Sequence, residues 1–296
     1  MYDPSRRSLA RRALDRGVGW LVEALFALLR WLGPDRASAL GGWIARGLGP
    51  YLGVSRVARD NLSRAMPALD AAARERILRE VWDNLGRTAT EFPHMDELAA
   101  ARTEIVGGEI LARIRASGRG AIFFTAHAAN WEIAPRVLQQ RGIQLNVIYR
   151  TLNNPHIDAL IQRYRGTGGE SIIAKGAPGA RETIRLLQAG RYLGLLLDQK
   201  MNDGIPVPFF GIDAMTPPAA ATLALRYGVP LVPGQVERLG GARFRLTIHE
   251  PIAIVATGDR HEDVRRMMTA VSAEIERWVR ADPGRWLWLH RRWPKR

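Results

Sequence analysis

The chain has 296 residues, and 43 lysines and arginines against 29 aspartates and glutamates give it a net charge of +14. Hydrophobic residues make up 47%, which excludes intrinsic disorder and supplies enough material for a buried core. The absence of cysteine excludes disulfide bridges, a thiol nucleophile, zinc ribbons and cysteine-ligated iron–sulfur clusters. The positive charge indicates an anionic partner of one of three classes, namely nucleic acid, lipid headgroups or an acidic carrier protein.

Most of the excess charge lies at the two ends of the chain. Residues 1–60 hold ten arginines and five acids, a balance of 10 − 5 = +5. Residues 285–296 hold five basic residues and no acid, again a balance of +5. The middle of the chain is nearly neutral, as in an ordinary folded domain.

A hydrophobic run over residues 18–32 follows the arginine-rich start of the chain and contains two charges, Glu23 and Arg30. These charges count against a secretory signal peptide, and 15 residues are fewer than the about 20 that a spanning helix needs. The two charges are seven residues apart and share one helix face, while tryptophan and leucine cover the rest. We favour an amphipathic helix in the membrane interface. There are two alternatives. The run is a short spanning helix, or it forms core helices together with the second apolar stretch, 40–52.

Beyond the N-terminal segment, the sequence first predicts helices and then an alternation of strands and helices. The predicted helical lead-in, 54–100, has segments 55–65 and 71–91. The predicted strands are 121–125, 144–149, 170–174, 192–197, 230–236 and 243–248. The predicted helices between and after them are 131–140, 155–164, 178–189, 217–227 and 259–280. This alternation predicts an α/β fold with a mainly parallel central sheet flanked by helices.

The densest group of reactive side chains follows the predicted buried strand 121–125, at the edge where open α/β sheets hold their sites. His127 lies in the turn and Glu132 in the first helical turn, five residues on. A bend can bring the carboxylate to the imidazole and fix its tautomer, so that the other ring nitrogen takes a proton from a hydroxyl. The alternative is a helix cap formed by Asn130, with Glu132 favouring the helix dipole and His127 incidental.

Other motifs give no competing chemistry. The sequence contains no G-x-S-x-G elbow, P-loop, H-E-x-x-H or G-x-G-x-x-G pattern. The triplet 261–263 fits a solvated helix cap better than a metal site, so we expect neither a metal nor a cofactor. The tryptophan-rich segment 286–293 fits a strand or helix packed on the core better than an RNA-stacking surface.

The residues His127-x-x-Asn130-Trp131-Glu132 resemble the His-x4-Asp/Glu signature of the glycerolipid acyltransferase superfamily. Their form is similar to that of the late acyltransferases of bacterial lipid A biosynthesis, the lauroyl/myristoyl type. Five further matching pieces follow in the family's order, at 149–155, 174–176, 197–199, 208–211 and 286–293. The chain departs from the family pattern at Lys200, where the family often has a second acidic residue. This change is expected to affect the preference for the acceptor headgroup. The chain also resembles, less closely, mycobacterial phosphatidylinositol-mannoside acyltransferases.

The resemblance implies transfer of a fatty acyl chain from an acyl carrier protein thioester to a hydroxyl of a glycolipid, foremost a lipid A precursor. The implied catalytic residues are His127 as general base, Glu132 as its orienting carboxylate and Arg150 as the donor to the oxyanion. The residues implied in substrate binding are Asn130, Trp131, Lys175, Asp198 and Gln199. No covalent acyl-enzyme is needed, in agreement with the missing cysteine and serine elbow. A lysophospholipid or phosphatidylinositol-mannoside acyltransferase is the alternative.

The same resemblance predicts two regions, a basic arm with membrane-associated helices over 1–53 and a catalytic domain over 54–296. An acidic carrier protein is cytosolic, so we expect the catalytic domain to face the cytoplasm from the inner membrane. A single span with the arginines inside would place it outside, which favours the interfacial helix. The expected partners are the carrier protein, the glycolipid and the membrane surface. A basic nucleic-acid-binding protein is the remote alternative, and no RNP, helix-turn-helix or zinc signature supports it.

Overall fold

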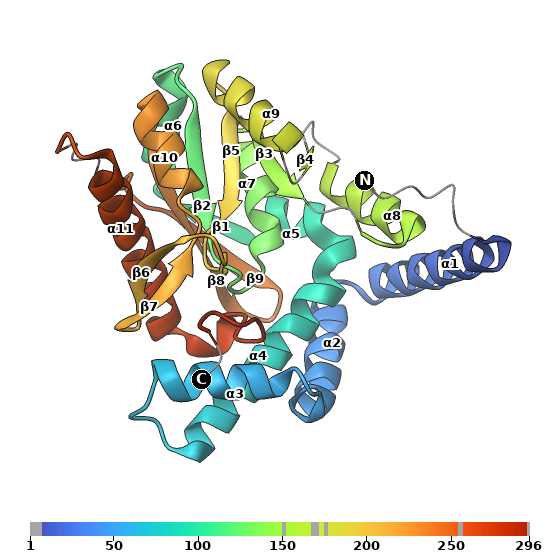
Figure 1. Ribbon diagram of the computed structural model, residues 1–296. Coiled ribbons are helices and arrows are strands. Elements are labelled where there is room, and N and C mark those ends of the chain that lie inside the picture. The colour runs from blue at the N-terminus through green and yellow to red at the C-terminus, as the bar shows by residue number, and fades with distance from the viewer. Residues whose placement is uncertain (1–7, 150–151, 167–171, 175–176, 254–256, 295–296) are drawn as a thin grey trace.

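A mainly parallel sheet forms the centre of the computed structural model, which describes residues 8–149, 152–166, 172–174, 177–253 and 257–294. Within these ranges the sheet has seven strands in the order β1-β9-β8-β2-β5-β3-β4, and only β8 and β9 pair antiparallel (Figure 1). A separate antiparallel hairpin joins β6 and β7. The strands are β1 (Thr103–Val106), β2 (Ala121–Thr125), β3 (Leu145–Tyr149), β4 (Ile172–Ala174), β5 (Tyr192–Leu196), β6 (Ile205–Phe209), β7 (Ile212–Thr216), β8 (Leu231–Gly240) and β9 (Arg243–Ile248). The predicted fold class is confirmed.

Helices cover both faces of this sheet. The α-helices are α1 (Leu9–Leu32), α2 (Pro34–Leu48), α3 (Ser55–Ala65), α4 (Ala71–Glu91), α5 (Met95–Ala101), α6 (Gly108–Ala116), α7 (Ala134–Gln140), α8 (Pro155–Gly166), α9 (Ala177–Gln188), α10 (Ala219–Tyr227) and α11 (Arg260–Ala281). The short 3-10 helices are η2 (Gly49–Tyr51), η3 (Phe92–His94), η4 (Trp131–Ile133) and η5 (Pro283–Arg285). The predicted helix 131–140 is therefore divided between η4 and α7.

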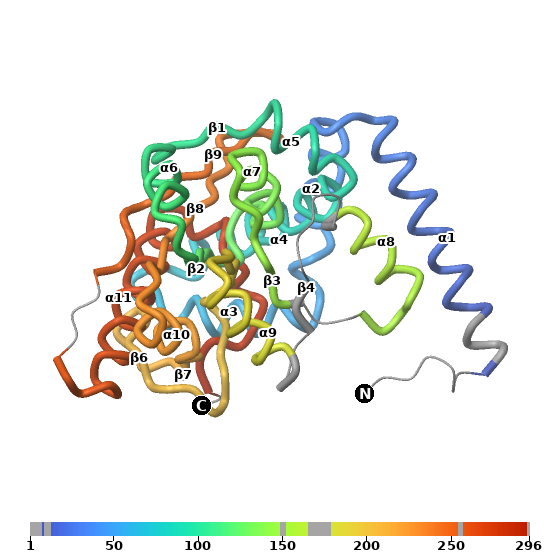
Figure 2. Tube along the Cα trace, turned by 90° about the horizontal axis from the view of Figure 1, so that it is seen from above, coloured from blue at the N-terminus to red at the C-terminus, as the bar shows by residue number. Residues whose placement is uncertain are grey.

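Strand β2 shows how the sheet separates two cores. Its alternate residues point to opposite faces, as the strand period of two requires. Ile122 and Phe124 pack with α9, α10 and α11, whereas Ala121 and Phe123 pack with α5, α6 and α7. All four are buried, which is typical of a parallel strand with both faces covered. Figure 2 shows the two helical layers on either side of the strands.

The first two helices pack on the rest of the chain through one face each. Phe26 of α1 meets Tyr164 of α8 edge-to-face, with ring centroids 5.3 Å apart. Helix α2 approaches α4 closely, because a Cβ added to Gly41 would lie 2.5 Å from the carbonyl oxygen of Gly86. In both helices the opposite face leaves large apolar side chains exposed. No helix among the described residues combines the length and apolar character needed to cross a membrane.

The tryptophan-rich C-terminal segment packs against the core, as the sequence predicts. Trp286, Trp288 and Trp293 are all fully buried. The segment forms neither the predicted strand nor a helix, but follows η5 as a series of turns with one isolated bridge, from Trp286 to Ala128. It thereby lies directly beneath the loop that follows β2.

Candidate active site

Parallel register brings two candidate residues from distant parts of the sequence together. In the β2–β5 pair, Thr125 lies opposite Leu196. His127 and Asp198 each follow two residues later, so they leave the sheet at the same edge. The Nδ1 atom of His127 lies 2.8 Å from Oδ1 of Asp198, and the backbone N–H of His127 donates to Oδ2 at 2.9 Å. This is the edge at which open α/β sheets hold their functional sites.

Asp198 is a buried, ionised carboxylate. Its side chain is fully buried, and the indole N–H of Trp286 donates to Oδ2 at 2.8 Å. Burial alone would raise the pKa of Asp198, but the charge of His127 and the hydrogen bonds from it hold that pKa well below its usual range. The carboxylate therefore keeps its charge and fixes the imidazole beside it.

The environment of His127 prepares one ring nitrogen to accept a proton. Burial lowers the pKa of His127, but the charge and hydrogen bond of Asp198, with a smaller contribution from the charge of Glu132, raise it overall. A proton on Nδ1 points to Asp198, so in the neutral ring Nε2 carries the lone pair. The amide nitrogen of Gln199 lies 3.4 Å from Nε2. The Trp131 ring meets the imidazole edge-to-face, with the two ring centroids 5.1 Å apart.

The carboxylate hydrogen-bonded to His127 belongs to Asp198, and not to Glu132 as the sequence spacing predicts. The expected bend does exist, because Ala129 has a left-handed backbone with φ 48°. It leads into η4, where Glu132 lies in the first turn. Asp198 reaches the ring from the adjacent end of β5, because the β2–β5 register places it beside His127. In this position Asp198 is suited to orient His127, whereas the resemblance implies a role in substrate binding.

Asn130 also differs from its predicted role in substrate binding. Its side chain is completely buried, and Nδ2 donates to Oε2 of Glu91 at 2.8 Å. It occupies the cap position of η4 but makes no side-chain cap hydrogen bond. This buried amide nitrogen is bonded to a carboxylate behind the loop, so we propose that Asn130 supports the loop.

Of the other predicted binding residues, Trp131 and Gln199 lie beside His127. Trp131 is half-buried and Gln199 is exposed, so both are open to a ligand. Arg150 and Lys175 lie outside the residues that the structure describes. The matching motif at 197–199 thus supplies two neighbours of His127.

The C-terminal segment contributes residues that sequence reasoning assigned to packing alone. The backbone N–H of Leu287 donates to the carbonyl oxygen of His127 at 2.9 Å. The ring of His290 lies 6.5 Å from that of His127, and its Nδ1–H donates to the carbonyl oxygen of Leu287 at 2.9 Å. Burial lowers the pKa of His290, which favours its neutral form. The alternation of tryptophans indicates burial, but it carries no information on which polar groups they bond.

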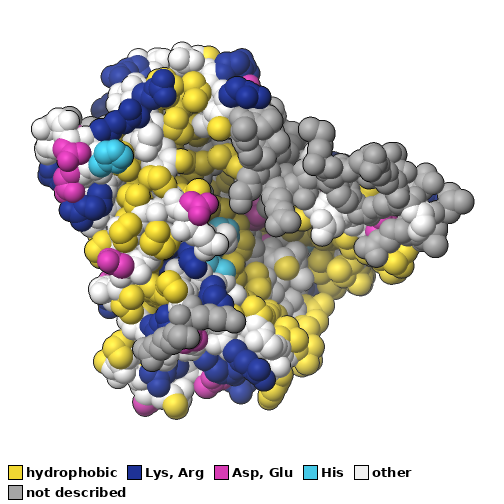
Figure 3. All heavy atoms as spheres, in the orientation of Figure 1, with side chains coloured by type: hydrophobic (Ala, Val, Ile, Leu, Met, Phe, Trp, Pro, Cys, Tyr) yellow, Lys and Arg dark blue, Asp and Glu magenta, His cyan; other side chains and the backbone are white. Residues whose placement is uncertain are grey.

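Beside His127 lies a narrow crevice that is too tight in this structure to hold a water molecule. It is lined by Val81, Asn84, Leu85, His127, Trp131, Trp286 and Leu287. In the space-filling view, histidine surface lies in a hollow between hydrophobic side chains (Figure 3). The described residues contain no group of three or more His, Asp or Glu side chains arranged to hold a metal ion. The arrangement suits proton abstraction from a hydroxyl on an amphipathic ligand.

Comparisons with known proteins point to an acyltransferase. A family model described as bacterial lipid A biosynthesis acyltransferase matches residues 5–295. A lipid A biosynthesis lauroyltransferase from Escherichia coli strain K12 is 24% identical over 251 residues, covering 82% of this chain and 79% of that protein. A phosphatidylinositol mannoside acyltransferase from Mycobacterium tuberculosis is 25% identical over 304 residues, covering 98% and 92%. The solved 1-acyl-sn-glycerophosphate acyltransferase from Thermotoga maritima aligns over 88% of this chain and 98% of that chain, at 12% identity and a TM-score of 0.40 too low to indicate a common fold.

Proposed function

The chain belongs to the bacterial lipid A biosynthesis acyltransferase family, and from this premise we propose that it acylates a glycolipid hydroxyl with His127 as general base. The observation that carries the proposal is the contact of His127 Nδ1 with the buried carboxylate of Asp198, which leaves Nε2 as the basic atom. The proposed donor is an acyl carrier protein thioester.

In the proposed reaction, the acceptor hydroxyl attacks the thioester carbonyl while Nε2 of His127 takes its proton. The negative charge of Asp198 stabilises the imidazolium that forms. Collapse of the tetrahedral intermediate forms the ester bond and breaks the carbon–sulfur bond. The departing thiolate then takes the proton from His127, which returns the ring to its neutral state. Each turnover therefore needs neither a covalent acyl-enzyme nor an added proton.

The developing oxyanion requires a hydrogen-bond donor near Nε2. Arg150 remains our proposed donor, since it matches the family motif at the end of β3. Gln199 and Trp131, which lie beside His127, are proposed to contact the acceptor. Lys175 is proposed to bind the acceptor headgroup, because an ammonium group pairs well with phosphate.

Two acceptor classes are proposed. A lipid A precursor follows from the family that matches nearly the whole chain. A phosphatidylinositol mannoside is the second candidate, because the relative with that named activity is as similar and is aligned over more of the chain. Lysophospholipid remains the third acceptor to test.

We also propose that residues 1–53 rest on the cytoplasmic surface of the inner membrane and present the catalytic region, 54–296, to its lipid acceptor. Exposed apolar residues support this proposal. On α1, α2 and the following turn they are Leu14, Trp20, Leu21, Leu25, Leu28, Trp31, Leu40, Trp43, Ile44, Leu48, Tyr51 and Leu52. Exposed Arg30, Arg36 and Arg46 are interspersed with them, a combination typical of helices that lie in an anionic lipid interface.

The experiment that tests the function measures acyl transfer with purified full-length enzyme. Donors are lauroyl and myristoyl thioesters of acyl carrier protein and of coenzyme A. Acceptors are a lipid A precursor, a phosphatidylinositol mannoside and a lysophospholipid, each in mixed micelles. We expect turnover with the carrier-protein donor and a glycolipid acceptor. Turnover confined to coenzyme A donors would refute the donor assignment, and turnover confined to lysophospholipid would refute the glycolipid.

A further inference from the structure

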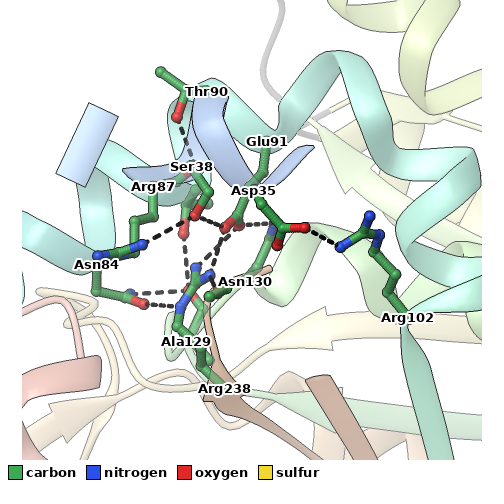
Figure 4. A network of polar contacts seen from close by, with 12 residues as sticks. Asp35, Ser38, Asn84, Arg87, Thr90, Glu91, Arg102, Ala129, Asn130 and Arg238 are labelled. Atoms are coloured by element: carbon green, nitrogen blue, oxygen red, sulfur yellow. Dashed lines mark hydrogen bonds and ion pairs between the residues drawn. The ribbon is translucent and has the colours of Figure 1, made fainter. Parts of the chain in front are cut away.

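A buried ion pair lies directly behind the loop that carries His127 (Figure 4). Glu91, at the end of α4, and Arg238, in β8, have side chains that are 0% and 2% exposed. Oε1 of Glu91 accepts hydrogen bonds from Arg238 and, at 2.6 Å, from the hydroxyl of Ser38. Oε2 accepts from Nη2 of Arg238 at 3.0 Å and from Nδ2 of Asn130 at 2.8 Å. One carboxylate therefore joins α2, α4, β8 and the loop after β2.

The same network reaches the strained residue of the loop. Arg238 Nε donates to Oδ1 of Asn84 at 3.2 Å, and Nδ2 of Asn84 donates to the carbonyl oxygen of Ala129 at 3.0 Å. The hydroxyl of Thr88 donates to that oxygen as well, at 3.1 Å. Ala129 is a non-glycine residue with φ 48°, a conformation that persists only where surrounding groups impose it. Two donors from α4 and the buried amide of Asn130 supply that constraint.

Stability alone gives a weak reason for such a pair. Taking a carboxylate and a guanidinium out of water offsets much of their attraction, so well-packed apolar residues often stabilise a fold as well. The network instead fixes backbone positions. Ala129 and Asn130 lie between His127, which takes the proton, and Trp131, which stands beside its ring.

We propose that Glu91 and Arg238 are positioning residues for acyl transfer. The pair holds Ala129 and Asn130 so that His127 and Trp131 keep their relative positions when the acceptor binds. Neither residue touches the reacting atoms. The hydrogen bond from Ser38 to Glu91 also connects the pair to α2, which is one of the helices with an exposed apolar face. This inference rests on the proposed role of His127.

The test compares variants that remove the network with a matched pair on the surface. Glu91→Leu with Arg238→Met removes both charges together, so that no buried charge is left without its partner. Arg113→Gln with Glu250→Gln removes an ion pair whose side chains are 59% and 68% exposed. We expect the buried double variant to melt below the wild type, because Ser38 and Asn130 lose their acceptor, and to remain folded at the assay temperature. Its kcat falls at least 10-fold and its KM for the acceptor changes less than threefold, whereas the surface variant matches the wild type.

Thr88→Val supplies a second, uncharged test that applies even if the double variant fails to fold. It removes one donor to Ala129 and conserves volume, and Thr88→Ser restores that donor. We expect kcat to fall about threefold in Thr88→Val and to recover in Thr88→Ser. Wild-type kcat in Thr88→Val, or in a folded Glu91→Leu/Arg238→Met variant, overturns the positioning role. His127→Ala, assayed alongside, separates the two ideas, because its continued activity would refute the base and not the network.

Discussion

Asp198 Oδ1 lies 2.8 Å from Nδ1 of His127, although 71 residues separate the two in the sequence. Both residues stand two positions beyond a paired position in adjacent parallel strands. Their geometry is therefore set by the register of the two strands. A carboxylate in such a position controls both the tautomer and the proton affinity of the imidazole.

The pH dependence of acyl transfer tests this control. The general base must be neutral, so the rate rises as pH increases through the pKa of His127, which the structure raises above its ordinary value of about 6.5. Asp198→Asn removes the charge that raises this pKa and leaves the burial that lowers it. We expect the acidic limb of kcat/KM to move to lower pH, and kcat to fall on the order of 10²-fold because the imidazolium loses its counter-charge.

Asp203→Asn is the matched control for this measurement, because Asp203 is exposed five residues further along the chain. Asp203→Asn should leave both kcat and the pH of the acidic limb of kcat/KM unchanged. If the acidic limb of kcat/KM lies at the same pH in Asp198→Asn and in the wild type, the group that titrates in this limb is not His127.

Glu132→Gln separates the two carboxylates that the sequence motif and the structure put forward. The charge of Glu132 contributes less to the raised pKa of His127 than Asp198 does. We therefore expect the acidic limb to move down by a smaller amount, and kcat to fall less than in Asp198→Asn. A shift equal to or larger than that of Asp198→Asn would return the orienting role to Glu132.

Removal of the base itself gives the largest predicted effect. His127→Ala leaves the hydroxyl without a proton acceptor, and loss of a general base costs about 10²–10⁴-fold in rate. Single-turnover assays of acyl transfer should show a loss within this range. His261→Ala is the control, since His261 is exposed at the start of α11. Equal rates in the two variants would refute the mechanism.

The elements that the sequence predicts well are those whose local pattern decides their structure. The predicted helices 55–65 and 71–91 agree with α3 and α4, and Asp70 caps the start of α4, since its side chain accepts a hydrogen bond from the backbone N–H of Ala73 at 2.6 Å. The apolar run 121–125 agrees with β2, since a strand buried on both faces shows an uninterrupted apolar stretch. The sequence does not predict the hairpin strand β6, because proline is disfavoured inside strands and β6 contains Pro206 and Pro208. They are tolerated there because both are exposed in a two-stranded ribbon.

The site was predictable in part, for a related reason. His127 could be found because it follows a buried strand directly and matches a short motif. Asp198 is also found, by its motif at 197–199, but its pairing with His127 is not, because strand order and register are tertiary features that no local pattern encodes. Asn130 illustrates the same limit, since a polar loop residue suggests solvent exposure, and its buried partner Glu91 lies 39 residues upstream.

Trp286→Phe tests whether the C-terminal segment supports Asp198. The indole N–H is one of the hydrogen-bond donors to this carboxylate, and a bond to a charged group contributes about 1.5–3 kcal/mol. Without it, kcat should fall about 10-fold, because the carboxylate that holds the His127 ring loses one of the groups that fix its position. Trp288→Phe is the control, because it removes a buried indole bond to the carbonyl of Pro283. If both variants lose kcat equally, the effect of Trp286 is on packing alone.

Vesicle binding tests the proposed membrane-facing surface of α1 and α2. Trp31 and Trp43 are 80% and 74% exposed, one on each helix. Burying a large apolar side chain in the interface gains roughly 1.5–3 kcal/mol, and 1.4 kcal/mol is a tenfold change in affinity. We therefore expect Trp31→Ser with Trp43→Ser to weaken co-sedimentation with anionic phosphatidylglycerol vesicles at least about 10-fold. Its kcat toward micellar substrate should be unchanged, because neither residue lines the crevice beside His127.

Two comparisons complete this last test. Val106→Ser removes an exposed apolar side chain from β1 in place of the N-terminal helices, so it should bind vesicles as the wild type does. Vesicles of neutral phosphatidylcholine should bind the wild type more weakly, because exposed Arg30, Arg36 and Arg46 add attraction to anionic headgroups. Raising the salt concentration should reduce that difference, since screening weakens charge attraction and leaves apolar burial in place. Wild-type binding by the double tryptophan variant would contradict the assignment of this surface to the membrane.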